Sequence, residues 1–185
     1  MGGVEVEELI VKALDLDEKD ALIEELMDNY GQEIIRLVYS YVNNKEVAED
    51  LTQDIFVKCY KALHTYNGKS QLKTWLWSIA INHCKDFLKS WYNKNVVMKE
   101  EIAENRTHKG MVEEVVIQKE EDDQLISVVM TLPIKYREVI YLFYYEDLLI
   151  KEIAVMTEVS VNTVKTRLRR AKQLLEERLE GSKNG

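Results

Sequence analysis

The sequence predicts an all-α protein made of two helical domains joined by a flexible linker. Only one proline, Pro133, and seven glycines occur in 185 residues, so residues that interrupt helices are scarce. Hydrophobic residues make up 46% of the chain, enough to form buried cores. Apolar residues recur at helical spacing in two stretches separated by an acidic, irregular one. We therefore expect domains over residues 21–93 and 120–182, with the linker over residues 94–119.

Three amphipathic helices are expected in the first domain. The first covers residues 21–42 and the second covers residues 45–63. A turn-like segment, HTYNGKSQ at residues 64–71, precedes the third helix, which runs to about residue 92. Ser70 is its expected N-cap because a serine hydroxyl accepts a hydrogen bond from an unpaired N–H of the first turn.

The second domain is expected to contain four shorter helices, over residues 120–131, 134–146, 148–156 and 161–179. Leu132-Pro133 ends the first of them, and Pro133 suits the first turn of the next because its missing N–H would have no helical partner there.

The net charge of −8 is distributed unevenly along the chain. Residues 1–28 contain ten acidic residues and two lysines, and residues 99–123 contain nine acidic and four basic residues. By contrast, residues 64–95 and 151–175 each carry a net charge of +4. Phosphate binding depends on the local field, so both basic segments are candidate nucleic-acid surfaces. The acidic extension, residues 1–20, matches no assignable motif, and three interpretations stay open for it: an ordered helix, a disordered lead, or an autoinhibitory segment that mimics nucleic acid.

Several function classes are disfavoured by the composition. No run of about 18 apolar residues could span a membrane, and the N-terminus does not resemble a signal peptide. The two cysteines, Cys59 and Cys84, fit a reducing cytosol, so we expect a cytoplasmic protein. His64, His83 and His108 lack metal-ligand spacing, and no phosphate-binding glycine loop or hydrolase motif occurs. We expect no enzymatic activity, no cofactor and no metal.

Residues 147–175 have the spacing of a helix-turn-helix. Ile153 and Ala154 belong to the inner face of its first helix, and Val164 and Leu168 to that of its second. The outer face of the second helix carries the polar and basic candidates for reading a major groove: Asn162, Thr163, Lys165, Thr166, Arg167, Arg169 and Arg170. A merely solvated basic face is the alternative, but almost no acidic residue before Glu176 could pair with these cations.

A polar cluster is expected on the second helix of the first domain. Asp50, Gln53 and Asp54 project from one side of that helix. Such a face can be plain solvent exposure, or it can dock against a basic partner helix.

The segment HTYNGKSQLKTWLW at residues 64–77 combines aromatic residues with lysines, as a single-stranded DNA site requires. Tyr66 and Trp77 are expected to offer aromatic faces, with Trp77 pointing outward, whereas Trp75 suits the core at least equally well. Lys69 and Lys73 supply the positive charge. Further along the same helix, the polar face continues through Asn82, Lys85 and Lys89.

Four motifs together resemble the extracytoplasmic-function (ECF) group of sigma-70 family RNA polymerase sigma factors. In order, they are VAEDLTQD (47–54), LKTWLWSIAIN (72–82), LPIKYREV (132–139) and VSVNTVKTRLRRAKQLL (159–175), and the resemblance covers roughly residues 21–180. It implies that the first domain is a sigma-2 domain and the second a sigma-4 helix-turn-helix domain. The implied function is that of an alternative sigma factor, which directs core RNA polymerase to promoters with particular −10 and −35 elements.

The resemblance also implies roles for individual residues. Asp50, Gln53 and Asp54 would grip the coiled coil of the largest polymerase subunit, and the second domain would dock near the flap region. The 64–71 loop would receive a flipped-out base of the −10 non-template strand. Binding of single-stranded −10 DNA would involve Tyr66, Asn67, Lys69, Ser70, Lys73, Trp77, Asn82 and Lys85. Binding of double-stranded −35 DNA would involve Asn162, Thr163, Lys165, Thr166, Arg167, Arg169 and Arg170.

Regulation by an anti-sigma factor, in many cases membrane-anchored, is implied as well, together with a role in a stress or cell-envelope response. One departure concerns DNA melting: Ser78-Ile79 occupies the position where primary sigma factors carry a paired-tryptophan wedge. We therefore expect weaker melting and a need for a closer promoter match.

Two other classes remain open at this level. One is a helix-turn-helix regulator that binds DNA as a dimer independently of polymerase docking. The other is a helical adaptor that sequesters partners, but it would leave Lys165 to Arg170 without a role.

Overall fold

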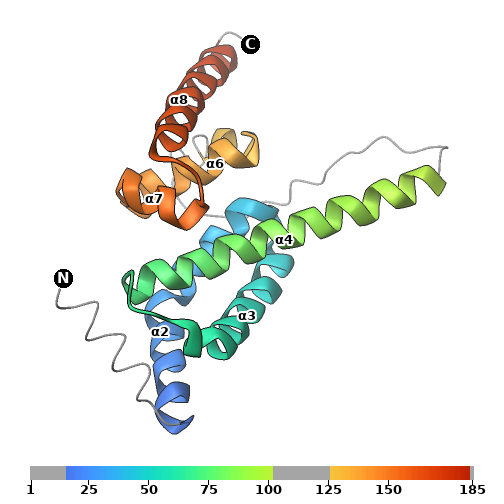
Figure 1. Cartoon of the computed structure of the whole chain (residues 1–185). Coiled ribbons are helices and arrows are strands. Elements are labelled where there is room, and N and C mark those ends of the chain that lie inside the picture. Colours follow the sequence, from blue (N-terminus) through green and yellow to red (C-terminus); the bar gives the residue numbers. More distant parts are fainter. Residues whose placement is uncertain (1–15, 102–125, 184–185) are drawn as a thin grey trace.

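The structure, a computed structural model, describes residues 16–101 and 126–183, and these residues form helices without any strand. This confirms the predicted fold class. The elements in chain order are α2 (Leu16–Val42), α3 (Lys45–Ala62), the 3-10 turn η1 (Leu63–Thr65), α4 (Leu72–Glu101), α6 (Ile134–Ile140), the π-helical η2 (Tyr141–Tyr145), α7 (Ile150–Thr157) and α8 (Val161–Lys183) (Figure 1).

In the first domain, α2, α3 and α4 pack against one another around a common core. Ile34, Leu37 and Ile55 are fully buried, as the predicted apolar stripes require. The break between α2 and α3 has a local cause. Asn43 adopts the left-handed conformation with φ 51°, and the Asn44 side chain accepts a hydrogen bond from the Val47 N–H at 3.0 Å.

Three local features of this domain differ from the expected ones: the start of α2, the end of α4 and the N-cap of α4. α2 begins at Leu16, so residues 16–20 of the expected N-terminal extension are helical. α4 continues to Glu101, through residues 94–101 of the expected linker, and the rest of that linker lies outside the described residues. Ser70 is not the N-cap of α4, which starts at Leu72. The carbonyl of Ser70 instead accepts a hydrogen bond from the Tyr66 hydroxyl at 2.6 Å.

The second domain has the expected helix-turn-helix. α6 starts directly after Pro133, and the helical path continues through η2 to Tyr145, as predicted. α7 ends at Thr157, and its C-cap Glu158, with a φ of 58°, reverses the chain toward α8. The Ser160 hydroxyl accepts a hydrogen bond from the Thr163 N–H at 3.1 Å, and this caps the recognition helix.

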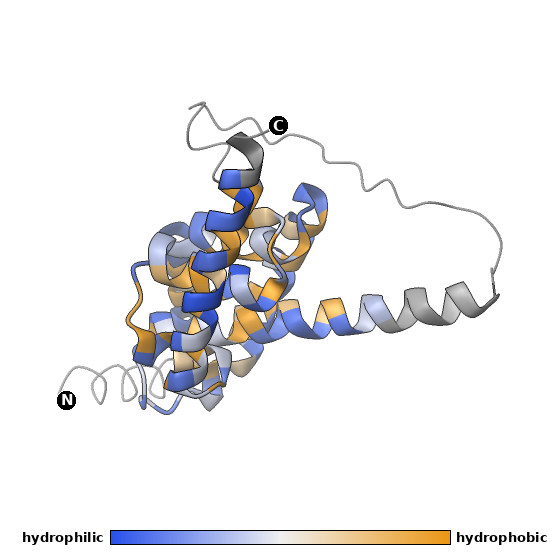
Figure 2. Cartoon of the chain, turned by 90° about the horizontal axis from the view of Figure 1, so that it is seen from above, coloured by the Kyte–Doolittle hydropathy of each residue, from blue (hydrophilic) through white to orange (hydrophobic). Residues whose placement is uncertain are grey.

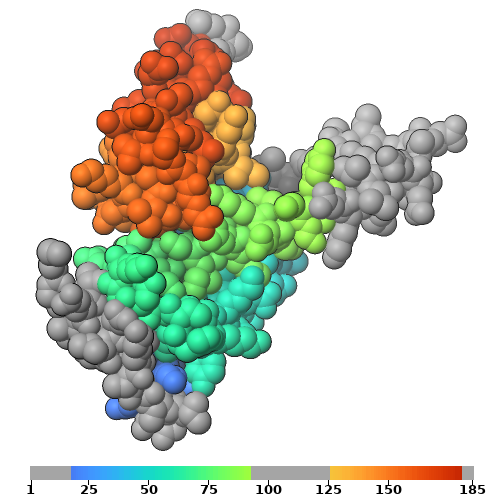
Figure 3. Space-filling model, in the orientation of Figure 1, coloured from blue at the N-terminus to red at the C-terminus, as the bar shows by residue number. Residues whose placement is uncertain are grey.

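The two domains pack directly on each other. α7 lies against α4, α6 lies against α2, and a single cluster of buried hydrophobic residues includes members of both domains. Figure 3 shows the orange-red second domain resting on the green α4. The sequence indicated two domains on a linker but gave no indication that they would dock.

Hydrophilic and hydrophobic residues alternate around the helices (Figure 2), in agreement with their amphipathic patterns. None of the helices in the described parts of the chain combines the length and apolar character needed to cross a bilayer.

Candidate nucleic-acid and partner interfaces

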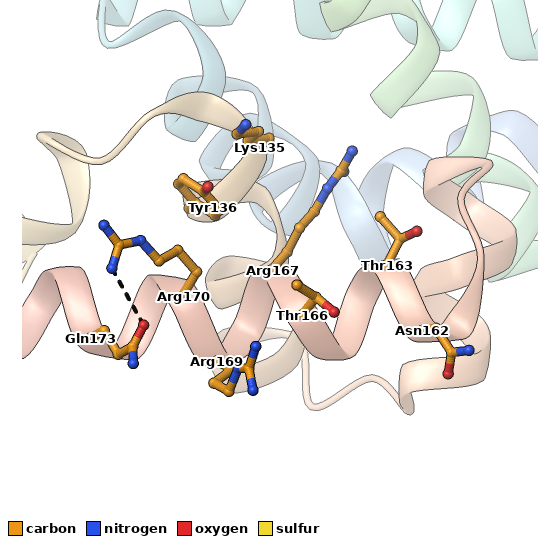
Figure 4. Close-up of a pocket in the computed structure, with 9 residues that line it drawn as sticks. All are labelled: Lys135, Tyr136, Asn162, Thr163, Thr166, Arg167, Arg169, Arg170 and Gln173. Atoms are coloured by element: carbon orange, nitrogen blue, oxygen red, sulfur yellow. Dashed lines mark hydrogen bonds between the residues drawn. The ribbon is translucent and has the colours of Figure 1, made fainter.

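The recognition helix α8 is held in place by its inner face. Val164, Leu168 and Ala171 are buried against the rest of the second domain, which leaves the opposite face open. This face borders an open groove of about 560 Å³ between α6 and α8 (Figure 4). The groove is lined by Lys135, Tyr136, Asn162, Thr163, Thr166, Arg167, Arg169, Arg170 and Gln173. Six of the seven residues predicted to read the −35 element therefore lie on one surface.

Lys135 and Tyr136 were missed by the analysis of the recognition helix alone. They belong to α6, and the Lys135 ammonium lies 5.0 Å from the centre of the Tyr136 ring. Their signal was present in the sequence, because both fall in the LPIKYREV motif just after Pro133. Packing of α6 against α8 brings them to the groove, and this packing could not be deduced from helical periodicity.

Lys165 is the exception among the predicted −35 residues. It lines a second, smaller groove of about 330 Å³ together with Leu168, Arg169 and Lys172 of α8 and with Phe143, Tyr144 and Ile150. Arg169 borders both grooves. The basic surface thus wraps around α8.

The arginines of the main groove differ in solvent exposure and in their side-chain partners. Arg170 is half exposed, and its guanidinium donates a hydrogen bond to the Gln173 side chain at 3.4 Å, drawn in Figure 4. Arg167 is less exposed and forms an ion pair with the buried Glu138 at 3.4 Å. Arg167 is therefore tied to the interior of the molecule. Arg170 instead has an exposed ion-pair partner, Glu177 at 3.9 Å, which an approaching phosphate could replace.

The 64–71 loop has an ordered framework beneath an exposed polar rim. Gly68, with φ 65°, makes the turn. The Asn67 side chain accepts a hydrogen bond from the Lys69 N–H at 3.1 Å, and both residues are exposed. Ser70 is partly exposed. These three predicted −10 residues could therefore contact a nucleic-acid base.

The aromatic part of the −10 prediction needs correction. Trp77 was expected to point outward, but it is fully buried and contacts the Tyr30 ring edge-on at 5.4 Å between ring centres. Tyr66 is only 1% exposed, and its ring packs against Trp75 at 5.7 Å. Neither predicted ring offers a face to a base. Tyr66 instead supports the loop, through its contact with Trp75 and its hydrogen bond to the Ser70 carbonyl, whereas Trp77 belongs to the main core of the domain.

Lys73 lies at the junction of both domains. Its ammonium is 4.7 Å from the centre of the Trp77 ring and 3.3 Å from the Glu33 carboxylate. It also approaches Glu146 of the second domain at 3.9 Å. Burial raises the pKa of Glu146, and the nearby Glu33 carboxylate raises it further. Lys73 thus combines a structural position with the positive charge predicted for the strand path.

Asn82 and Lys85, the last two residues of the predicted −10 set, face the second domain. The Asn82 amide donates a hydrogen bond to the Glu158 carboxylate at 3.2 Å. The Lys85 ammonium donates one to the Thr157 carbonyl at 3.3 Å and lies 2.9 Å from the Glu138 carboxylate.

The predicted polar face of α3 is solvent-exposed. Asp50, Gln53 and Asp54 are all exposed, and they lie on the same helix as Val57 and Tyr60, which are 51% and 39% exposed. The sequence reading missed the two apolar residues, although exposed apolar groups near charges are typical of a docking surface.

His83 of α4 lies behind this face, with its imidazole 3.9 Å from the Asp54 carboxylate. Its side chain is mostly buried, so His83 lies at the edge of the core. Burial lowers the pKa of His83, and the positive charge of Lys58 lowers it further, against an opposing effect of Asp54 and Asp86.

The cysteines show no sign of reactivity. Both thiols are fully buried, and burial raises the pKa of Cys59 and of Cys84 to about 12. Within residues 16–101 and 126–183, no cluster of three or more histidine, cysteine or acidic side chains could hold a metal ion.

Comparison with known families gives two matches that follow the division of the chain. The family model for Sigma-70 region 2 matches residues 26–92, and the model for Sigma-70, region 4 matches residues 122–175.

Several bacterial sigma factors match most of the chain. The chain is 33% identical to the RNA polymerase sigma factor SigV of Bacillus subtilis, covering 84% of this chain and 89% of SigV. It is 28% identical to the ECF RNA polymerase sigma factor SigW of the same organism, covering 91% and 94%. It is 29% identical to the ECF RNA polymerase sigma-E factor of Escherichia coli, covering 84% and 85%.

Two solved structures share the fold. One is CnrH in complex with the cytosolic domain of CnrY, with a TM-score of 0.66 and 18% identity over 96% of this chain and 97% of that one. The other is the sigma factor RpoE in complex with the anti-sigma factor NepR from Bartonella quintana, with a TM-score of 0.66 and 20% identity over 85% and 96%.

Proposed function

The chain belongs to the extracytoplasmic-function group of sigma-70 family RNA polymerase sigma factors, and from this premise we propose how its surfaces divide the work of promoter recognition. As a sigma factor it directs transcription initiation. In our proposal the α3 face binds core polymerase, the loop and α4 bind the −10 strand, and α8 reads the −35 duplex.

The groove between α6 and α8 supports the −35 assignment. Thr163 and Thr166 offer short hydroxyls near the start of the helix, where base edges are reached in a major groove. Arg169 and Arg170 offer guanidinium groups for bases or phosphates. Lys135, on the opposite wall, suits a phosphate of the flanking backbone, so that the duplex would be held from both sides.

For the −10 strand we retain the exposed Asn67 and Lys69 and the partly exposed Ser70 at the loop, together with Asn82 and Lys85, which are partly exposed on α4. A base extruded from the duplex must be captured by polar groups that compensate for lost stacking, which costs about a few kcal/mol. Tyr66 is assigned to holding the loop and Trp77 to the core of the first domain, and neither to stacking on bases, because both are buried.

The observation that carries this proposal is the exposed face of α3. A helix-turn-helix alone would also suit a regulator that binds DNA as a dimer. Such a regulator has no use for Asp50, Gln53 and Asp54 exposed beside Val57 and Tyr60. An acidic rim around apolar residues suits a basic helical partner, and the coiled coil of the largest polymerase subunit is the partner that the family provides.

We further propose control by an anti-sigma factor in the cytoplasm, where core polymerase acts. The fold is shared with RpoE, which was solved with the anti-sigma factor NepR, and with CnrH, which was solved with the cytosolic domain of CnrY. A membrane anchor on the regulator, docking of the second domain near the polymerase flap and a role in an envelope stress response belong to the same proposal.

The test of polymerase docking is charge reversal on α3. The variant Asp50→Lys/Asp54→Lys should lower the affinity for purified core polymerase by at least about tenfold, because like charges would then face each other. Both side chains are exposed, so the melting temperature should change little. Affinity can be measured by fluorescence anisotropy of labelled chain.

The matched control is Glu24→Lys/Glu25→Lys, which makes the same charge change at exposed positions on α2. It should bind core polymerase as the wild type does. Equal affinities for all three proteins would show that the α3 face is not the docking surface.

A further inference from the structure

The polar side of α4 that carries Asn82 and Lys85 continues for about two more turns. Successive residues of an α-helix are about 100° apart around its axis, so one arc of about 80° contains Asn82, Lys85, Lys89 and Tyr92. We call this row of four residues the α4 stripe. Lys89 is exposed, and Tyr92 is 65% exposed. The stripe therefore ends in an aromatic ring that is open to solvent.

Core packing does not account for Tyr92. Within the described part of the chain, Phe87 and Leu88 are the last α4 residues that pack against the hydrophobic core. The helix continues to Glu101, and its far end projects beyond the other helices (Figure 1). Tyr92 thus lies where α4 leaves the body of the first domain, and its ring is accessible to a ligand.

The charge around the α4 stripe suits the phosphates of a nucleic acid. Residues 64–95 contain five lysines and one acidic residue, Asp86, which lies about 100° around the helix from Lys85. Lysines beside an aromatic face are the combination that single-stranded DNA requires, because phosphates are neutralised and unpaired bases stack on the ring. The charge reverses at Glu100, which would repel a phosphate. The favourable surface therefore ends between Tyr92 and Glu100.

We propose that Tyr92 is the residue of the −10 site on which a base of the promoter strand stacks, and that the α4 stripe carries this strand past Lys85. Tyr66 and Trp77, the aromatic residues expected in that role, are buried. The helix rises by about 10 Å between Lys85 and Tyr92, which corresponds to about three stacked nucleotides. This inference rests on the proposed function of α4 as a −10 surface.

The experiment measures binding of the full chain, assembled with core polymerase, to two fluorescent non-template oligonucleotides from a promoter that this complex transcribes. The shorter oligonucleotide contains only the −10 element, and the longer one has about four further nucleotides on each side. Tyr92→Ala should bind the longer oligonucleotide roughly tenfold more weakly than wild type, because one stacking contact is lost. It should bind the shorter one as wild type does. Tyr92→Phe keeps the aromatic face and should match wild type with both.

The matched control is Trp91→Ala, which removes an aromatic side chain that is 55% exposed but lies about 160° around the helix from Lys89. It should bind both oligonucleotides as wild type does. The stacking role is refuted if Tyr92→Ala binds the longer oligonucleotide like wild type, loses equally with both, or is matched in its loss by Tyr92→Phe.

The shorter oligonucleotide separates this inference from the proposed function. If the wild-type complex binds it no better than a scrambled sequence, the −10 assignment itself fails. If that binding is specific and Tyr92→Ala still matches wild type with the longer oligonucleotide, only the role of Tyr92 fails.

Discussion

Glu138 illustrates how a buried carboxylate determines the chemistry around it. Removing a charge from water is costly unless partners surround it, and Glu138 has three, from α2, α4 and α8. Glu138 also affects the pKa of Tyr41. Burial raises the pKa of the Tyr41 hydroxyl well above its ordinary value, and the adjacent Glu138 carboxylate raises it further, so this hydroxyl remains a donor.

His83 gives a prediction on pH. Folding lowers its pKa below the ordinary 6.5, mainly through burial. Below pH 6.5 the unfolded chain therefore binds a proton that the folded chain resists, and the wild type loses stability as pH falls. His83→Gln should gain in unfolding free energy relative to wild type between about pH 7 and about pH 5.5.

Urea unfolding at several pH values measures this difference. His64→Gln, at an exposed position, is the control and should keep the pH dependence of the wild type. A His83→Gln variant with that same dependence would contradict the assignment.

Trp77 gives a prediction on stability. Because its side chain is fully buried, Trp77→Ala should lower the unfolding free energy by about 3–5 kcal/mol. Tyr92→Ala, at a position 65% exposed on the same helix, should change it by no more than about 0.5 kcal/mol. If both variants lost equally little unfolding free energy, Trp77 would have to lie at the surface, as the sequence predicted.

At the level of elements, α6 and α8 act together as the walls of one groove. Lys135→Ala should weaken binding of −35 duplexes uniformly across sequences, because a phosphate contact carries no sequence information. Binding of the variant releases one counterion fewer from the DNA. The slope of log affinity against log salt concentration should therefore be smaller in magnitude by about 0.9.

The groove prediction is measured by salt titration of duplex binding in the polymerase-bound state. Lys61→Ala removes the same charge from an exposed site on α3 and should leave the slope unaltered. An unaltered slope for the Lys135→Ala variant would show that α6 does not contact the DNA.

Element boundaries show what local sequence can determine. The α2–α3 break and the cap of α8 were predictable because Asn44 and Ser160 make hydrogen bonds within a few residues. The end of α4 was not, because no proline or glycine interrupts residues 93–101 and the acidic composition alone was read as linker. Trp77 was misjudged because it lies close to the loop in sequence, and only its packing against Tyr30 shows that its ring is covered. The core position considered for Trp75 agrees with its contact with Tyr66.

At the scale of the whole molecule, domain docking lay beyond sequence reasoning. The pairs Lys85–Glu138 and Asn82–Glu158 join residues far apart in the chain, and each residue alone reads as an ordinary polar surface group. The four motifs, by contrast, were sufficient to indicate both domains and their family, because each motif is local. The sequence thus predicts which residues form a polar surface. Which of these surfaces one domain covers on the other depends on how the domains pack.

The most direct measurement is run-off transcription with purified core polymerase on a library of randomised promoters. We expect transcripts from templates that share two sequence elements at a fixed separation, and we expect their loss with Asp50→Lys/Asp54→Lys. Absence of any transcript that depends on this chain would contradict that expectation. So would tight, sequence-specific binding of the same promoters by the chain without polymerase.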